Sequence, residues 1–151
     1  DPQMLPLVGR LGLTYVAMHK RGNPKTMQSM TDYEDVTSDV ADYFSDFSDR
    51  AGQCGVGDWI LDPGFGFAKT LEQNYQLMRD LSSFKAAFPS RRLLVGVSRK
   101  SMVYRLLGIT PEESLPATQV LHLHALQNGA DILRVHDVVQ AAQTVSLYRI
   151  L

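Results

Sequence analysis

Polar side chains that can bind a ligand or take part in a reaction gather at four points of this sequence, and each point follows a short apolar run. The most informative are Asp62, Lys100, Arg134 and His136. An ionised Asp62 offers two acceptor oxygens and no donor, which suits a flat ring edge that carries adjacent N–H groups. Lys100 is a cation able to reach a ring carbonyl or nitrogen. Arg134 and His136 stand two apart on an extended segment, so both side chains leave the same face.

The pair formed by Arg134 and His136 indicates an anion site. Burying that much positive charge is costly unless an anion meets it. Guanidinium and imidazole groups together suit the oxygens of a phosphate or diphosphate. We therefore expect a phosphorylated ligand at this point of the chain.

The segment ILDPGFGFAKT, residues 60–70, surrounds Asp62. Gly64 and Gly66 permit a tight turn and a close approach of ligand to backbone, and a phenylalanine can wall the space beside them. The alternative is a plain turn at the end of a strand, because Asp, Pro and Gly are the usual turn formers.

Four apolar runs, rich in β-branched or aromatic residues, predict strands that are buried on both faces. They are Leu13–Met18, Trp59–Leu61, Leu93–Val97 and Ile132–Val135. The segments between and after them carry helical spacing of apolar residues. We predict helices over Thr31–Arg50, Thr70–Phe84, Ser101–Leu107, Leu115–Gln127 and Val138–Leu151. Thr31 and Glu34 stand in a capping-box arrangement at the start of the first of these helices.

This alternation predicts an α/β fold with a parallel sheet and right-handed crossovers. Each polar cluster then sits at the carboxyl end of its strand. In parallel α/β folds the loops at that edge bind ligands. We therefore expect the four clusters to converge on one pocket.

Composition bounds the function. The chain has 151 residues, 44% of them apolar, which suits a single domain over residues 1–151. A net charge of −1, with both signs spread along the chain, favours neither nucleic acid nor a membrane surface as partner. The lone Cys54 and the lack of a long apolar run or signal peptide favour a soluble, cytoplasmic protein.

Other polar residues have simpler interpretations. Asp137 is placed to cap the last helix, and Arg99 is expected in a solvated basic turn. His19 is either a site residue or a packed histidine, and we favour the site. His122 and His124 lack the spacing of a metal-binding pair and are expected to be structural.

The motifs together resemble those of the dihydropteroate synthases, enzymes of the pterin-binding TIM-barrel family. The segments that carry the resemblance are MHKRGNPKTMQ (18–28), ILDPGFGFAKT (60–70), LLVGVSRKSM (93–102) and ILRVHDV (132–138). They occur in the family's order and cover essentially the whole chain.

The resemblance implies a TIM (β/α)8 barrel, of which this chain supplies about four βα units, strands five to eight. Such a barrel takes about 250 residues. The first residues, Asp1 to Gln3, resemble the start of the helix before strand five. The resemblance also implies Mg²⁺, whose usual asparagine ligand belongs to the N-terminal half, so we expect no metal ligand among these residues.

The activity implied is the joining of 6-hydroxymethyl-7,8-dihydropterin diphosphate to 4-aminobenzoate, which releases diphosphate and forms dihydropteroate. By resemblance, Asp62 and Lys100 hold the two edges of the pterin ring, and Arg134 and His136 hold the diphosphate. Lys100, Arg134 and His136 are thereby implied as catalytic residues. The remaining substrate contacts implied are Val16, Met18 and Gly96 lining the pterin slot, Gly66 and Phe67 at its entrance, and Ser101 with the stem of Lys100 on the aminobenzoate side.

The complete enzyme is expected to be a homodimer. Two alternatives stay open. One is a methyltransferase-type pterin-binding barrel, although the motif SRKS followed by RVHD favours the synthase. The other is a non-catalytic half-barrel or assembly module, because an open half-barrel leaves strand edges and apolar faces uncovered. We expect little or no turnover from these 151 residues alone.

Overall fold

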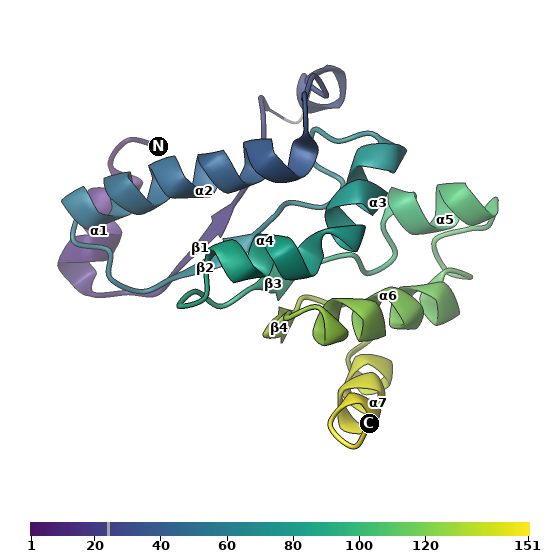
Figure 1. Cartoon of the computed structure of the whole chain (residues 1–151). Helices are drawn as coiled ribbons and strands as arrows, with labels where there is room; N and C mark the ends of the chain where they lie inside the picture. The colour runs from purple at the N-terminus through teal and green to yellow at the C-terminus, as the bar shows by residue number, and fades with distance from the viewer. Residues whose placement is uncertain (24) are drawn as a thin grey trace.

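The computed structural model describes residues 1–23 and 25–151 and the side chains of these residues other than Gln28. Pro24 and the Gln28 side chain, both in the MHKRGNPKTMQ motif, lie outside the described residues. Helices and strands alternate along the described chain (Figure 1). In order they are α1 (Met4–Leu11), β1 (Tyr15–Met18), a 3-10 turn (Met27–Ser29), α2 (Val36–Gln53), β2 (Trp59–Asp62), α3 (Leu71–Arg79), α4 (Leu81–Ala87), β3 (Leu94–Val95), α5 (Ser101–Leu107), α6 (Leu115–Gln127), β4 (Ile132–Leu133) and α7 (Val138–Tyr148).

The strands are parallel, as predicted, and run β1-β2 and β3-β4, with a bridge between Leu61 and Leu93 joining the two pairs. Each strand is shorter than the apolar run that predicted it, except β2, which extends to Asp62. Pairing continues past the end of β4, because the Arg134 N–H donates to the Val95 carbonyl at 3.0 Å.

The two faces of these strands have different surroundings. Ala17, Leu61 and Val95 belong to one hydrophobic core with the helices, which Figure 1 shows arrayed over the strands. Neighbouring positions along a strand point to the opposite face. That second face, called here the inner face, carries Val16, Met18, Ile60, Asp62, Leu94, Gly96, Ile132 and Arg134. It positions the site described below.

Aromatic rings anchor the longest helix on the strands. Phe44 and Phe47 of α2 pack on Trp59 of β2, with ring centroids 6.1 and 4.9 Å apart. All three are buried, and each fully buried ring contributes roughly 2 kcal/mol or more through the apolar surface it removes from water.

The start of α2 was predicted wrongly. Asp35 caps the helix, and its carboxylate accepts from the Ser38 N–H at 2.7 Å. The same carboxylate accepts from Gln76 of α3 at 2.7 Å, whereas the Thr31 carbonyl accepts from Gln73. Contacts with α3 therefore moved the helix start away from the Thr31 capping box.

The segment predicted as one helix over 70–84 is two helices. Thr70 and Gln73 form a capping box at the start of α3, and Asp80 ends α3 and begins α4. The Asp80 carboxylate accepts from Thr37 of α2 at 2.9 Å, which holds this break against the neighbouring helix.

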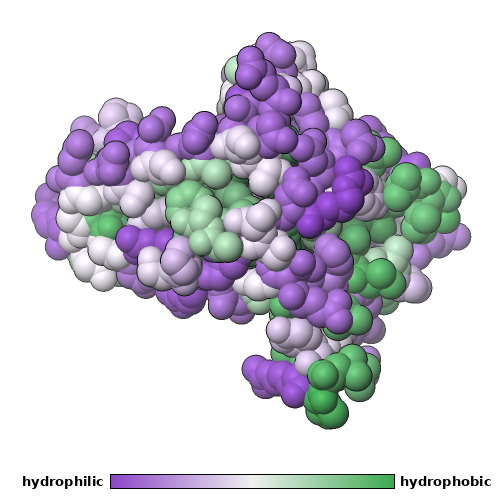
Figure 2. Space-filling model, in the orientation of Figure 1, coloured by the Kyte–Doolittle hydropathy of each residue, from purple (hydrophilic) through white to green (hydrophobic). Residues whose placement is uncertain are grey.

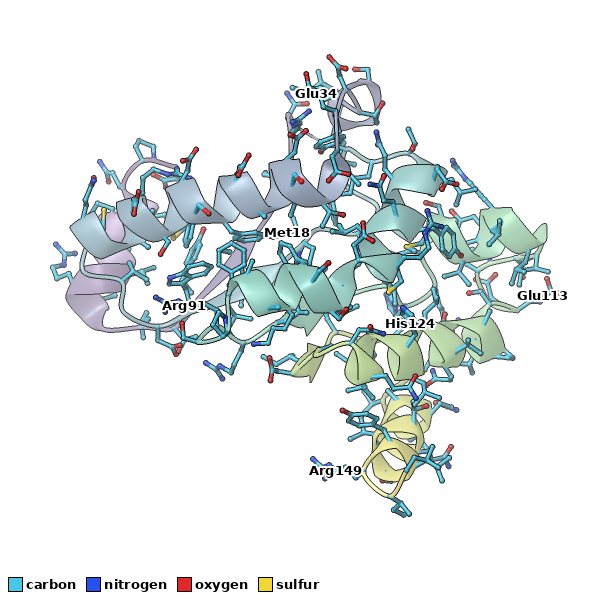
Figure 3. All side chains as sticks on the ribbon, viewed as in Figure 1. Met18, Glu34, Arg91, Glu113, His124 and Arg149 are labelled. Carbon is cyan, nitrogen blue, oxygen red and sulfur yellow. The ribbon has the colours of Figure 1, made fainter. Side chains whose placement is uncertain are left out.

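The C-terminal helices follow the prediction closely. The bounds of α5 and α6 are those expected, and α7 ends three residues earlier, at Tyr148. His124 reaches the Met78 carbonyl at 3.1 Å and His122 is fully buried, which confirms structural roles (Figure 3). Apolar surface is open over the end of α5 and the end of α7, where Leu106, Leu107 and Ile150 are exposed (Figure 2).

Candidate functional site

The candidate site lies at the carboxyl ends of the strands, on the inner face. Met18 of β1, labelled in Figure 3, is the register partner of Asp62 on β2. Arg134 lies just beyond β4. The guanidinium of Arg134 lies against Gly96, where an added Cβ would be 2.9 Å from Nε. Glycine at this position therefore leaves the space that Arg134 occupies.

Asp62 is the buried acceptor of the site, with only 1% of the residue exposed. Its Oδ1 accepts from the Gly64 N–H at 3.0 Å. Its Oδ2 lies 3.5 Å from Nη2 of Arg134, and no described residue gives it a hydrogen bond. A buried carboxylate oxygen without a donor is costly and rare, so this atom is positioned to accept from a ligand.

Burial also decides the titration of Asp62. Loss of hydration raises the pKa of its carboxyl, while the Gly64 N–H, Arg134, Lys100 and Lys69 act in the opposite direction. The surrounding donors and cations favour the ionised form. In its ionised form Asp62 can accept at both oxygens, as recognition of an N–H-rich ring edge requires.

Lys100 reaches the site from the N-cap position of α5. Its ammonium donates to the Phe65 carbonyl and lies 4.6 Å from the centre of the Phe67 ring. Burial lowers the pKa of Lys100 to about 8, with Asp62 opposing the shift. The lysine is therefore a partly desolvated cation near the carboxylate of Asp62.

Both glycines of the turn after β2 are required by the backbone. Gly64 has φ 70° and Gly66 has φ 80°, both in the left-handed region that favours glycine. A Cβ at Gly64 would lie 1.9 Å from the His19 carbonyl oxygen, so the turn packs directly on the end of β1. Of the two phenylalanines, Phe65 is buried in the core and Phe67 is partly exposed beside Lys100.

A small pocket of about 140 Å³ adjoins this turn. It lies between the starts of α3 and α5, and its lining includes Gly66, Asn74 and Ser101. The side-chain amide oxygen of Asn74 accepts a hydrogen bond from the Gly66 N–H at 2.6 Å. Ser101 thus lines a pocket that adjoins the glycine turn and does not include Asp62.

His136 and Arg134 are more open than expected. The side chain of Arg134 is 51% exposed, and His136 is an exposed residue that bonds Ser98 Oγ through Nδ1 at 3.1 Å. The expectation of buried positive charge was wrong, because no described segment covers the inner face at this point. Arg134 nevertheless lies on the face that carries Asp62, with Nη2 3.5 Å from Oδ2 of Asp62.

Comparison with known proteins decides the family. The sequence profile of the family described as "Pterin binding enzyme" matches residues 1–136 of the chain. The chain belongs to the pterin-binding enzyme family.

Relatives of this chain within the pterin-binding family include several dihydropteroate synthases. The dihydropteroate synthase of Escherichia coli K12 is 40% identical over 147 residues, which are 96% of this chain and 51% of the relative. That of Synechocystis sp. PCC 6803 is 44% identical over 95% of this chain and 50% of its own length. The chain spans about half the length of the curated relatives it matches.

Solved structures agree with this assignment. The crystal structure of Thermus thermophilus dihydropteroate synthase in complex with 4-aminobenzoate matches with a TM-score of 0.94 and 35% identity, covering 100% of this chain and 62% of that chain. A Yersinia pestis dihydropteroate synthase with a sulfonamide drug matches with a TM-score of 0.94 and 36% identity, over 99% and 55%. The chain thus has the fold of part of a TIM barrel, as expected.

Three polar residues of this pterin-binding chain have roles that differ from the sequence interpretation. His19 is 3% exposed and bonds Lys69, so it is a packed histidine that lies away from the inner face. The Asp137 side chain does not cap α7. It pairs instead with Arg99, which is therefore not a freely solvated cation.

Two residues beneath the turn were missed by sequence reasoning. Lys69 and Asn74 are 4% and 3% exposed, and both bond the backbone of the glycine turn. The one signal in the sequence was their proximity to DPGFGF, which does not distinguish a buried lysine from a solvated one.

Within residues 1–23 and 25–151, no group of three or more His, Cys, Asp or Glu side chains is close enough to hold a metal ion. Among the helices that the structure describes, none is long and apolar enough to cross a membrane.

Proposed function

We propose that this chain carries the pterin, diphosphate and aminobenzoate contacts of a dihydropteroate synthase. The reaction forms a bond between the pterin methylene carbon and the amine nitrogen of 4-aminobenzoate. It breaks the bond from that carbon to diphosphate, and the amine loses a proton. The observation that carries the proposal is the buried Oδ2 of Asp62, to which no described residue donates a hydrogen bond and which lies 3.5 Å from the Arg134 guanidinium.

Asp62 and Lys100 would hold the pterin ring by its edges. The carboxylate accepts from the ring's amino and N–H groups, and the Lys100 ammonium donates to the opposite edge. Lys100 would exchange its bond to the Phe65 carbonyl for one to the ring. Val16, Met18 and Gly96 would contact the pterin ring, because strand alternation places all three on the inner face with Asp62.

Arg134 and His136 would hold the leaving diphosphate. Arg134 is half exposed and only 3.5 Å from Asp62 as the structure stands, so its guanidinium can turn toward the anion while staying near the ring. Departure of diphosphate leaves positive charge on the methylene carbon. Stabilising the departing anion therefore accelerates the reaction more than a strong base for the weakly basic aromatic amine would.

The pocket behind the glycine turn would receive 4-aminobenzoate. Ser101 and Gly66 line it, while the stem of Lys100 lies 3.3 Å from where a Cβ on Gly66 would be. Phe67, whose ring faces Lys100, stands at the entrance. The two substrates would then meet across the turn, and the site would act mainly by orienting them.

The proposal includes a cytoplasmic homodimer. The free Cys54 suits a reducing compartment. Exposed apolar side chains of α6 and α7, among them Val120 and Leu147, border a hollow of about 250 Å³ that a second subunit would cover. Sedimentation of the full-length protein tests this part, and a monomer at micromolar concentration would contradict it.

The test of the activity is a coupled assay of diphosphate release by the full-length protein, with calorimetry of pterin diphosphate binding. We expect release only when 4-aminobenzoate is also present. Arg134→Ala should weaken pterin diphosphate binding severely while leaving the parent pterin alcohol, which lacks the diphosphate, nearly unaffected. Equal affinity of the variant for pterin diphosphate, or methyl transfer without diphosphate release, would refute the assignment.

A further inference from the structure

Lys69 lies beneath the glycine turn and has no part in the chemistry proposed above. Only 4% of the residue is exposed, and its Nζ makes three contacts. It donates to the Gly64 carbonyl at 3.1 Å and to the Phe67 carbonyl at 3.2 Å, and it meets Nδ1 of His19 at 3.0 Å. An ammonium has three donors, so all of them have a partner here.

The two carbonyls belong to residues that hold the site. Gly64 donates its N–H to Oδ1 of Asp62, at 3.0 Å. Phe67 presents its ring to the ammonium of Lys100, at 4.6 Å. Lys69 therefore binds the carbonyls of the same two turn residues that contact Asp62 and Lys100 through their other groups.

The third contact ties this turn to β1. His19 is 3% exposed, and its ring packs edge-on against Tyr43 of α2 with centroids 4.9 Å apart. Its backbone N–H donates to the Asp62 carbonyl at 2.9 Å. His19 is thus held in place by its packing and its backbone hydrogen bond, and the contact with Lys69 links the turn to it.

The surroundings of Lys69 weaken its hold on a proton, so its three donors are complete only below the lowered pKa. Burial lowers the pKa of Lys69 to about 7, with Asp62 opposing the shift and Lys100 and Arg21 adding to it. Burial also lowers the pKa of His19 to about 3, so the imidazole is neutral and one ring nitrogen is an acceptor. A buried lysine is uncommon unless its ammonium is fully paired.

We propose that Lys69 is a positioning residue that clamps the turn of residues 62–67 against β1 and thereby sets the places of Asp62 and Lys100. Side chains that contact a ligand keep their geometry only when neighbouring hydrogen bonds hold them. The ligand named in the test below rests on the proposed function, whereas the clamp itself does not.

The clamp is tested first without ligand, in the full-length protein. Lys69→Met keeps the length and apolar stem but removes all three donors. We expect the amides of Gly64 and His19 to exchange with solvent roughly tenfold faster than in the parent protein, while helix amides of α2 stay unchanged. Lys20→Met, one residue beyond His19 and exposed, is the matched control and should change neither.

A measurement on the parent protein covers the case in which the variant does not fold. At a pH below the pKa of Lys69, the ¹⁵N resonances of His19 should show the ring proton on Nε2, because Nδ1 accepts from Lys69. A proton on Nδ1 under that condition would overturn the clamp, as would unchanged amide exchange in a folded Lys69→Met protein.

Calorimetry with the pterin diphosphate then tests the consequence for the site. We expect Lys69→Met to bind roughly tenfold more weakly and Lys20→Met to match the parent. Faster exchange with unchanged affinity would mean that the clamp does not position the site, and would overturn the proposal. If the parent protein binds no pterin, the proposed function is refuted. Faster amide exchange in Lys69→Met would in that case still support the clamp.

Discussion

Arg99 and Asp137 form a two-point ion pair that joins the loops after β3 and β4. Nε of Arg99 donates to Oδ2 of Asp137 at 2.9 Å, and Nη2 donates to Oδ1. Arg99 has φ 51°, a left-handed conformation, and its N–H donates to Thr118 of α6 at 3.3 Å. The pair fixes the residue before Lys100 against the residue after His136.

Breaking this pair should loosen the site. In Asp137→Ala, Lys100 and His136 lose their fixed separation, and we expect the affinity for pterin diphosphate to fall by roughly tenfold. Asp42→Ala, an exposed carboxylate on α2, is the control and should bind normally. Calorimetry measures both. Because the Arg99 hydrogen bond lowers the pKa of Asp137, the defect should be absent only where acid has already protonated Asp137 in the parent.

Gly64 should tolerate no side chain. Gly64→Ala combines left-handed strain with a Cβ placed 1.9 Å from the His19 carbonyl, and we expect a loss of about 3 kcal/mol or more in the free energy of unfolding. Gly12→Ala is a matched control, since Gly12 has φ 62° but open space around it, and it should cost only about 1 kcal/mol. Denaturant titrations of both variants measure this. Equal losses would show that the turn can move off β1.

Asp62→Asn should separate binding from stability. Burial raises the pKa of this carboxyl in the folded protein above its usual 3.8, so the ionised form costs stability once the pH has risen through the folded-state pKa. We expect the variant to be as stable as the parent at neutral pH, or more stable, while pterin affinity falls because the amide brings a donor where an acceptor is needed. Thermal unfolding and calorimetry would decide, and undiminished affinity would remove Asp62 from the ring contact.

Lys100 should make pterin binding pH-dependent. Because burial lowers its pKa from 10.5 to about 8, affinity for the pterin should decline as the pH rises through about 8 and the ammonium is lost. Stability should change in the opposite sense, rising from about pH 8 toward 10.5, since the unfolded chain binds this proton more tightly. Lys100→Met should bind weakly with a flat profile over that range. A parent profile without decline there would mean that the charge of Lys100 does not contribute to binding.

Local patterns in the sequence were sufficient for much of this architecture. The bounds of α5 and α6 followed from the helical spacing of their apolar residues. The alternation of apolar runs with helical segments predicted parallel strands, and hence that Asp62 and Arg134 belong to one edge. These features depend on residues near one another in the chain, so periodicity and turn chemistry reveal them.

Features that depend on a distant partner were missed. Asp35, not Thr31, caps α2 because Gln76 of α3 shares its carboxylate. Asp137 has the residue type of a helix cap, yet a bidentate arginine 38 positions away takes both of its oxygens. A short-range preference of about 1 kcal/mol is readily outweighed by such a pairing.

The sequence alone therefore predicted the types and order of the groups at the strand ends. Residue identity determines which chemistry each group can do, and periodicity determines where the strands lie. Which of those groups are free was settled by packing. The donor-less oxygen of Asp62, the Lys69 ammonium between two carbonyls and His19, and the guanidinium of Arg134 over Gly96 each depend on atoms brought together from different βα units. Burial and hydrogen bonding across such distances set charge and position, and no local pattern encodes them.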